Sequence, residues 1–199
     1  MTPSQTIGPF FSYALTSDEN GRPLIASNHI HAPSDAEIHI EGKVLDGDGK
    51  PVSDAMLEIW QADANGRLAV PNDRANVNFL GFARTATGQD GNYIFETVKP
   101  GRTNNQDNIL QAPYINLVVF ARSILSQLYT RIYFADENSN DKDPVLAIIQ
   151  DPDRRTTLIA VPDSDRSGQT KYQFDIHLQG DAETVFFQWS QSILIEEKL

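Results

Sequence analysis

Short runs of alternating apolar and polar residues recur along most of the chain. In the segment 36–46, AEIHIEGKVLD, Ile38 and Ile40 alternate with His39 and Glu41 before the turn sequence DGDGK. A period of two places every second side chain on the same face of a β-strand. Comparable runs occupy 55–63, 81–87, 92–101, 114–121, 130–137 and 171–180. Short strands at this spacing predict an all-β fold with an antiparallel β-sandwich core.

Turn sequences separate these runs and suggest how the strands pair. Asn65-Gly66 ends the run 55–63, and GQDG joins 81–87 to 92–101, which predicts a hairpin between those two runs. The runs 114–121 and 130–137 are predicted to form another pair. DGDGK resembles the start of a calcium loop, but Lys50, Pro51 and Leu57 stand where such a loop needs an oxygen ligand, a glycine and a glutamate. We interpret it as a turn.

Helical signals are few. Asp143 is a candidate N-cap followed by Pro144 at the first helical position, and Asp151-Pro152 repeats this pattern. One or two short helices are therefore expected. Residues 1–35 lack a strand or helix pattern and are rich in proline, so we interpret them as an irregular N-terminal arm contacting a partner chain. Residues 36–199 then form the sandwich domain.

Composition narrows the class of protein. The chain has 199 residues, enough for one domain, and a net charge of 16 − 27 = −11, which disfavours nucleic-acid binding. No apolar run approaches the roughly 20 residues needed to span a bilayer, and the N-terminus does not resemble a secretory signal. There is no cysteine, which excludes disulfides and thiolate chemistry. A cytoplasmic protein without a membrane partner is expected.

Few local motifs carry chemistry by themselves. His29 and His31 form a His-x-His pair, but a four-coordinate metal site needs at least three protein ligands. His39 lies on the next run and His177 far downstream, so we expect no dependable third ligand and interpret the pair as ordinary loop histidines. No nucleophile elbow, P-loop or dinucleotide fingerprint is present.

Seven segments, taken together, resemble the intradiol ring-cleaving dioxygenases. They occur in the family's order and cover nearly the whole chain: TPSQTIGPFF (2–11), LEIWQADANG (57–66), GFARTAT (81–87), TVKPG (97–101), VVFARSILSQLYTRIYFADE (118–137), RRTTLIA (154–160) and FDIHLQGDAETVFF (174–187). The resemblance implies the family's chemistry, in which a non-haem Fe(III) enzyme opens a diphenol ring with O₂ between the two hydroxyl-bearing carbons. Two tyrosines and two histidines hold that iron, as suits a hard cation.

The ligand positions of that family are all changed in this chain. Leu68 stands for the first tyrosine after QADANG, and Thr103 stands for the second after KPG. Tyr114 and Asn116 fill the His-x-His slots, and Gln111 replaces the preceding arginine. The resemblance therefore implies a chain without a metal site or catalytic residue. It corresponds to an alpha subunit that is inactive alone and assembles with a homologous beta subunit holding Fe(III).

The resemblance also implies residues that shape the partner's pocket. These are Thr6, Gly8 and Pro9 in the arm, together with Arg131, whose guanidinium suits an aromatic carboxylate. An ordinary turn and a surface ion pair are the simpler readings. The expected substrate is protocatechuate, which O₂ would convert to 3-carboxy-cis,cis-muconate in the β-ketoadipate pathway of aromatic catabolism.

Two other functions remain open at this point. A β-sandwich can serve as a non-enzymatic binding module, because a fold does not fix a function. A homo-oligomeric dioxygenase with relocated ligands could draw on the four histidines and on Tyr93, Tyr114, Tyr129 and Tyr133. Nothing in the spacing of these residues recreates a set of four ligands.

Overall fold

Nine strands and three short helices make up the described parts of the chain. The computed structural model describes Leu15 and residues 27–30, 37–69, 79–122, 124–163 and 170–188. The strands are β1 (Glu37–Leu45), β2 (Met56–Gln61), β3 (Phe82–Ala86), β4 (Asn92–Val98), β5 (Ile115–Phe120), β6 (Leu128–Phe134), β7 (Ile159–Asp163), β8 (Thr170–Gln173) and β9 (Ile176–His177). The helices are η1 (Asn138–Lys142), α2 (Pro144–Ile148) and α3 (Pro152–Thr156). Within these ranges, no helix is long and apolar enough to cross a membrane.

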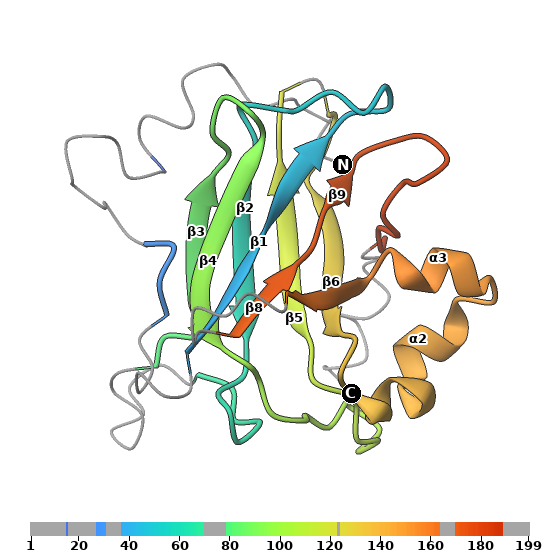
Figure 1. Ribbon diagram of the computed structural model, residues 1–199. Coiled ribbons are helices and arrows are strands. Elements are labelled where there is room, and N and C mark those ends of the chain that lie inside the picture. The colour runs from blue at the N-terminus through green and yellow to red at the C-terminus, as the bar shows by residue number, and fades with distance from the viewer. Residues whose placement is uncertain are drawn as a thin grey trace, which may run out of the picture.

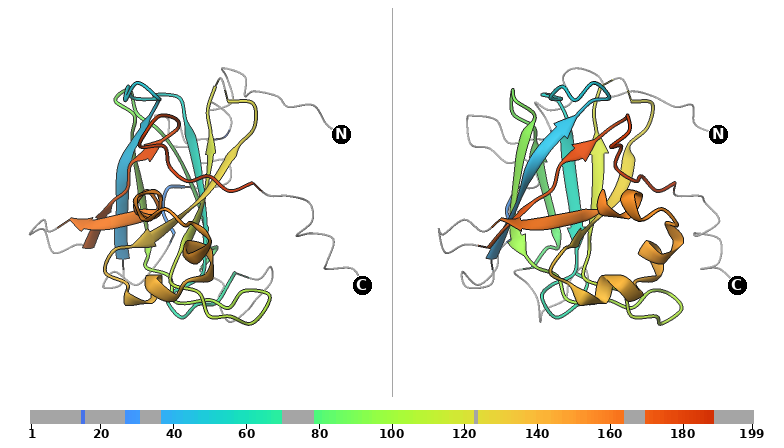
Figure 2. Two further views of the ribbon diagram at one scale, coloured as in Figure 1. Left: turned by 90° about the vertical axis from the view of Figure 1, so that its right-hand side faces the viewer. Right: turned by 45° about the vertical axis from the view of Figure 1, so that its right-hand side comes forward.

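The strands form one curled, mixed sheet. Their order is β3-β2-β5-β6-β7-β8-β1-β4, with β9 beside β1. The half containing β2, β3, β5 and β6 faces the half containing β1, β4 and β8, and one core lies between them (Figures 1 and 2). Pairing is mostly antiparallel, and the parallel pairs are β1–β8, β1–β9 and β6–β7. The predicted all-β class with short helices is confirmed, as is the pairing of β5 with β6.

Alternation along the strands accounts for the core. In β1, Ile38, Ile40 and Val44 are buried between the two halves, whereas His39 and Glu41 lie on the outer face. β5 does the same with Ile115, Leu117 and Val119. Burial of a branched apolar side chain contributes about 1.5–3 kcal/mol, so this inner face is the main source of stability.

The hairpin predicted around the GQDG turn is wrong. β3 pairs with β2, and β4 pairs with β1. Beyond β3, the Thr87 N–H donates to the Ala55 carbonyl at 2.9 Å, and the Ala55 N–H donates to the Thr87 hydroxyl at 3.0 Å. At the other end of the turn, the Val44 N–H of β1 donates to the Gly91 carbonyl at 3.0 Å. These bonds hold the two ends of the turn on opposite halves of the sheet, so β3 and β4 do not pair with each other.

Residues 27–30 bridge the two edge strands. The Arg84 N–H of β3 donates to the Ser27 carbonyl at 3.0 Å, and the Glu96 N–H of β4 donates to the Asn28 carbonyl at 3.0 Å. The segment thus occupies backbone groups on both edges. Because an unpaired edge invites association with other chains, this bridge also protects the sheet.

Both predicted helix starts are confirmed. The Asp143 carboxylate accepts from the Val145 and Leu146 N–H groups, and the Asp151 carboxylate accepts from the Asp153 N–H. α2 and α3 lie together beside β6 (Figure 1). A second, smaller core forms there from buried Ala112, Tyr133, Leu146 and Leu158.

The DGDGK and Asn65-Gly66 segments are tight turns, as predicted. The Asp46 carboxylate accepts from the Asp48 and Lys50 N–H groups at 2.9 and 2.8 Å, so its oxygens serve the turn. Gly66 has a φ of +77°, and a Cβ there would lie 2.1 Å from the Arg102 carbonyl oxygen. Gly66 therefore allows two loops to touch.

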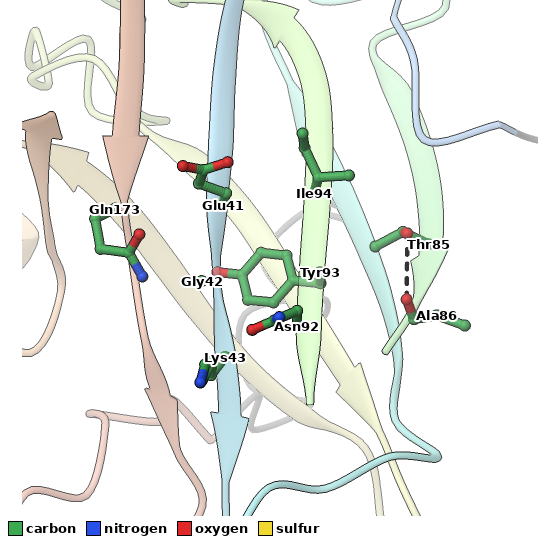
Figure 3. A pocket seen from close by; sticks show the side chains of 9 residues that line it. All are labelled: Glu41, Gly42, Lys43, Thr85, Ala86, Asn92, Tyr93, Ile94 and Gln173. Atoms are coloured by element: carbon green, nitrogen blue, oxygen red, sulfur yellow. Dashed lines mark hydrogen bonds between the residues drawn. The ribbon is translucent and has the colours of Figure 1, made fainter. Parts of the chain in front are cut away.

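The run 171–180 forms two short strands where one was expected. Between these two strands, the Asp175 carboxylate accepts from the Lys43 N–H of β1 at 2.9 Å, where a continuous strand would offer a backbone carbonyl. Gly42 lets this segment approach, since a Cβ there would lie 1.9 Å from the Phe174 carbonyl oxygen. The hydroxyl of Tyr93, which lies across β1 at Gly42 in Figure 3, donates to that same oxygen at 2.5 Å. Burial, then the Asp175 charge, raises the pKa of Tyr93 and keeps it a donor.

The Gly42→Ala variant tests this contact. An added Cβ must displace backbone, so we expect a loss of about 1–3 kcal/mol or more in unfolding free energy, measured by urea denaturation of the full-length chain. Gly88→Ala is the control, because its Cβ would meet only the Asp90 carboxylate at 3.3 Å and the Asn92 carbonyl at 3.8 Å. That variant should change stability by less than about 1 kcal/mol. Equal stability of the two variants would contradict the close approach.

Candidate functional site

Four positions, which the sequence resemblance matches to the family's iron ligands, lie in two loops and at the start of β5, near one end of the sheet. The loop after β2 contains Leu68, the loop after β4 contains Thr103, and Tyr114 and Asn116 lie at the start of β5. The Gly101 N–H donates to the Asp63 carbonyl at 2.8 Å, which joins the first two loops. The Gln111 N–H donates to the Thr103 carbonyl at 2.8 Å, which holds Thr103 against the part of the second loop that leads into β5.

The side chains at these positions differ in exposure and role. Leu68 is 63% exposed. The Thr103 hydroxyl is buried and has no hydrogen-bond partner within the described structure. Asn116 is half-buried on the outer face of β5, in register with Trp60 on one side and Arg131 on the other. Gln111, in the slot of the family's arginine, is buried.

This donor set does not fit ferric iron. Leu68 offers no donor atom, and Thr103 and Asn116 offer only neutral oxygen or amide groups. The ring of Tyr114 lies beneath the Arg131 guanidinium, whose carbon is 3.8 Å from the ring centroid. A fixed positive charge at that distance opposes the binding of a trivalent cation.

Arg131 belongs to a small polar network that fills this end of the outer face. Its Nη1 donates to the Tyr133 hydroxyl at 3.2 Å, and that hydroxyl donates to the Asp143 carboxylate at 3.1 Å. The same carboxylate accepts from the Ala112 N–H at 2.9 Å, and Ala112 is two residues before Tyr114 in the sequence. The rings of Tyr114 and Tyr133 lie 6.1 Å apart. The network therefore ties β5 and β6 to the start of α2.

The charge state of Tyr133 follows from its surroundings. Burial raises the pKa of Tyr133, and the neighbouring Arg131 cation offsets this only in part. The Asp143 carboxylate raises the pKa further. Tyr133 therefore stays a neutral phenol that donates to Asp143 near neutral pH.

Arg131 keeps binding capacity beyond this network. A guanidinium has five N–H donors, and in the described part of the chain only the Tyr133 hydroxyl accepts from it. The side chain is half-buried, so water competes less strongly for those donors. This arrangement can bind a carboxylate at the edge of β6. The arm residues Thr6, Gly8 and Pro9 lie outside the described residues.

Sequence reasoning missed the partners of Arg131. The sequence predicted Tyr133 only as a possible ligand of a relocated iron site, and Asp143 only as a helix cap. The spacing of Arg131 and Tyr133, two residues apart on one strand, was the available signal that they share a face. The link to Asp143 depends on how α2 packs, which no local pattern specifies.

Sequence reasoning did not consider the carboxylates that lie near His29. Glu37 and Glu96 supply further candidate ligands, because one ligand atom from each of the three residues lies within 4.8 Å of the others. His31 lies outside the described residues. A separate depression of about 480 Å³ between β1, β3, β4 and β8, drawn in Figure 3, includes none of the four family ligand positions.

Comparison with known proteins agrees with this architecture. A family model described as "Dioxygenase" matches residues 7–180. The chain is 45% identical over 195 residues to a protocatechuate 3,4-dioxygenase alpha chain from Pseudomonas putida, covering 94% of this chain and 96% of that one. It is 30% identical over 187 residues to a protocatechuate 3,4-dioxygenase beta chain from Burkholderia cepacia, covering 89% of this chain and 75% of that one.

Solved structures show the same fold at lower identity. The dioxygenase domain of a carbohydrate-binding fusion protein from Streptomyces sp. SirexAA-E superposes with a TM-score of 0.61 at 22% identity, covering 90% of this chain and 98% of that one. With the family match over most of its length, the chain belongs to the intradiol ring-cleaving dioxygenases, an iron-dependent family of oxidoreductases. Among the relatives above, its likeness is greater to the alpha chain than to the beta chain.

The Asp143→Ala variant tests the network. It removes a helix cap and leaves the buried Ala112 N–H without its acceptor, so we expect a loss of about 2–4 kcal/mol in unfolding free energy by urea denaturation. Asp151→Ala removes only the exposed cap of α3 and should cost about 0.5–2 kcal/mol. A smaller loss at Asp143 than at Asp151 would show that the network contributes little.

Proposed function

We propose that this chain is the alpha subunit of a protocatechuate 3,4-dioxygenase. One observation carries the proposal: the chain matches an alpha chain over nearly its full length at 45% identity. None of the four positions matched to the iron ligands keeps the family's residue, and the four together do not fit iron. A homologous beta subunit would hold Fe(III), and this chain alone would be inactive. The complex would act in the cytoplasm as part of the β-ketoadipate pathway.

The reaction proposed for the complex joins protocatechuate and O₂ to give 3-carboxy-cis,cis-muconate. Iron in the beta subunit would activate the bound diphenol toward O₂. This chain would contribute binding and orientation. Arg131 would hold the substrate carboxylate through the guanidinium donors that its neighbours leave unused. Stacking on Tyr114 and the bond to Tyr133 support this role, because they fix the guanidinium before substrate arrives.

A face suited to a partner chain adjoins Arg131. Trp60, Leu68 and Leu80 are 49%, 63% and 72% exposed, and Trp60 is in register with Asn116 beside Arg131. The exposure of these large apolar side chains supports an interface with another chain. Arg84 on the same face donates to the Leu15 carbonyl at 3.1 Å, which fastens part of the arm there. We propose that the arm, residues 1–35, contacts the partner and that Thr6, Gly8 and Pro9 line its pocket.

Co-expression with a catalytic beta subunit tests the assignment. The two chains should purify together with about one iron per pair, and ring cleavage of protocatechuate should require both. Iron is counted by elemental analysis, and cleavage is followed by absorbance. If this chain alone held stoichiometric ferric iron and cleaved diphenols, the assignment would be wrong. A stable monomer that ignores the beta subunit would favour a non-enzymatic binding module.

Arg131→Ala in the complex tests the substrate role. Loss of a charge-assisted hydrogen bond should raise KM for protocatechuate about ten- to hundredfold with the iron content unchanged. Arg122→Ala is the matched control, because Arg122 is exposed and pairs with Asp54 away from this network. It should leave KM unchanged. An unaltered KM in Arg131→Ala would contradict the proposed role, and Tyr114→Phe, which retains the stacked ring, should resemble the parent protein.

A further inference from the structure

A cluster of imidazoles and carboxylates lies on the other half of the sheet. The Nε2 atom of His29 is 3.1 Å from one carboxylate oxygen of Glu37, and the Nε2 atom of His39 is 3.6 Å from the other. A Glu96 oxygen completes a group with His29 and Glu37 whose ligand atoms all lie within 4.8 Å of one another. No residue of this cluster takes part in the proposed dioxygenase function.

Strand register assembles this cluster from three separate segments. His29 forms a parallel bridge with Glu96 of β4, and Glu96 is paired with His39 of β1. Side chains of paired residues lie on the same face of a sheet, so these three form a row across it. Glu37 is two residues before His39 and lies on that face as well. The arrangement is thus built into the pairing of the strands.

The chemistry of these groups suits a transition-metal cation. Zinc is bound by imidazole nitrogen and carboxylate oxygen at about 2.0–2.2 Å, which places neighbouring ligand atoms roughly 3.3 Å apart in a tetrahedral site. The 3.1 Å separation between the His29 and Glu37 ligand atoms is already close to that value, and the Glu96 oxygen lies within 4.8 Å of both. The side chains of His29, Glu37 and His39 are 28%, 19% and 14% exposed, so the site is partly shielded yet open to an ion.

Electrostatics also favours a cation at this place. Glu37 and Glu96 bring two partly buried carboxylates close together, and like charges at such a separation repel each other. Lys171 of β8 is in register with His39 on the side away from Glu96 and supplies one positive charge nearby. A divalent ion between the two carboxylates would neutralise them directly.

We propose that His29, Glu37 and Glu96 bind a divalent transition-metal ion of the zinc class, with His39 positioning Glu37 through its second oxygen. Water would complete the coordination. Because His29 belongs to the segment that bridges β3 and β4, the ion would fasten this segment to the sheet and stabilise the connection between these two edge strands. This site is structural and independent of the iron of the dioxygenase family.

Titration of the untagged, full-length chain with Zn²⁺ tests the site. If the chain purifies with a catalytic partner, the complex is used, and substitutions are made in this chain alone. Isothermal titration calorimetry, in buffer from which trace metals have been removed, should show one Zn²⁺ site in the parent protein. Binding at that site should be lost, or weakened at least about tenfold, in both His29→Gln and Glu96→Gln. The melting temperature of the parent protein should rise with Zn²⁺, and that rise should be absent in both variants.

His177→Gln is the matched control, because it removes a half-buried histidine outside the cluster. It should bind Zn²⁺ like the parent protein. His39→Gln should retain the site with weaker binding, as expected for a positioning residue. Circular dichroism without metal verifies that each variant is folded. Equal Zn²⁺ binding by the parent, His29→Gln and Glu96→Gln proteins, or no binding by the parent, would overturn the proposal.

Discussion

The register between β5 and β6 is the constraint on which the rest of this structure depends. It sets Asn116 opposite Arg131 and brings Tyr114 beside Tyr133. One face of these strands is buried by Ile115, Leu117 and Ile132, so a slip by one residue would turn that core outward. Apolar burial therefore fixes where the polar groups of the outer face stand.

That constraint does not depend on the four positions that the resemblance matches to iron ligands. Core residues hold β5 and β6 in place, and the ligand positions on the other face can change without unfolding the sheet. The outer face near these positions holds a cation stacked on a tyrosine, a neutral phenol and a buried carboxylate that caps a helix. Each member satisfies another, which is the condition for burying polar groups at small cost. Within the described structure, the Thr103 hydroxyl and the Asn140 side-chain oxygen are buried without a hydrogen-bond partner.

Alternation and capping patterns predicted most strands and both α-helices, α2 and α3, because these depend on neighbours in sequence. Partner choice between strands was harder. The GQDG turn has hairpin chemistry, yet bonds from Thr87 to Ala55 and from Val44 to Gly91 separate its two strands. The candidate site was likewise only partly predictable from the sequence. Motif order located Leu68, Thr103, Tyr114 and Asn116, whereas the Arg131–Tyr133–Asp143 network and the grouping of His29 with Glu96 arise from tertiary packing.

A crystal structure of the complex with bound protocatechuate, with iron located by anomalous scattering, tests the central claim most directly. The account predicts iron only in the partner chain, and the Arg131 guanidinium at about 2.7–2.9 Å from the substrate carboxylate. An iron peak among Leu68, Thr103, Tyr114 and Asn116, or a substrate carboxylate held without Arg131, would contradict it.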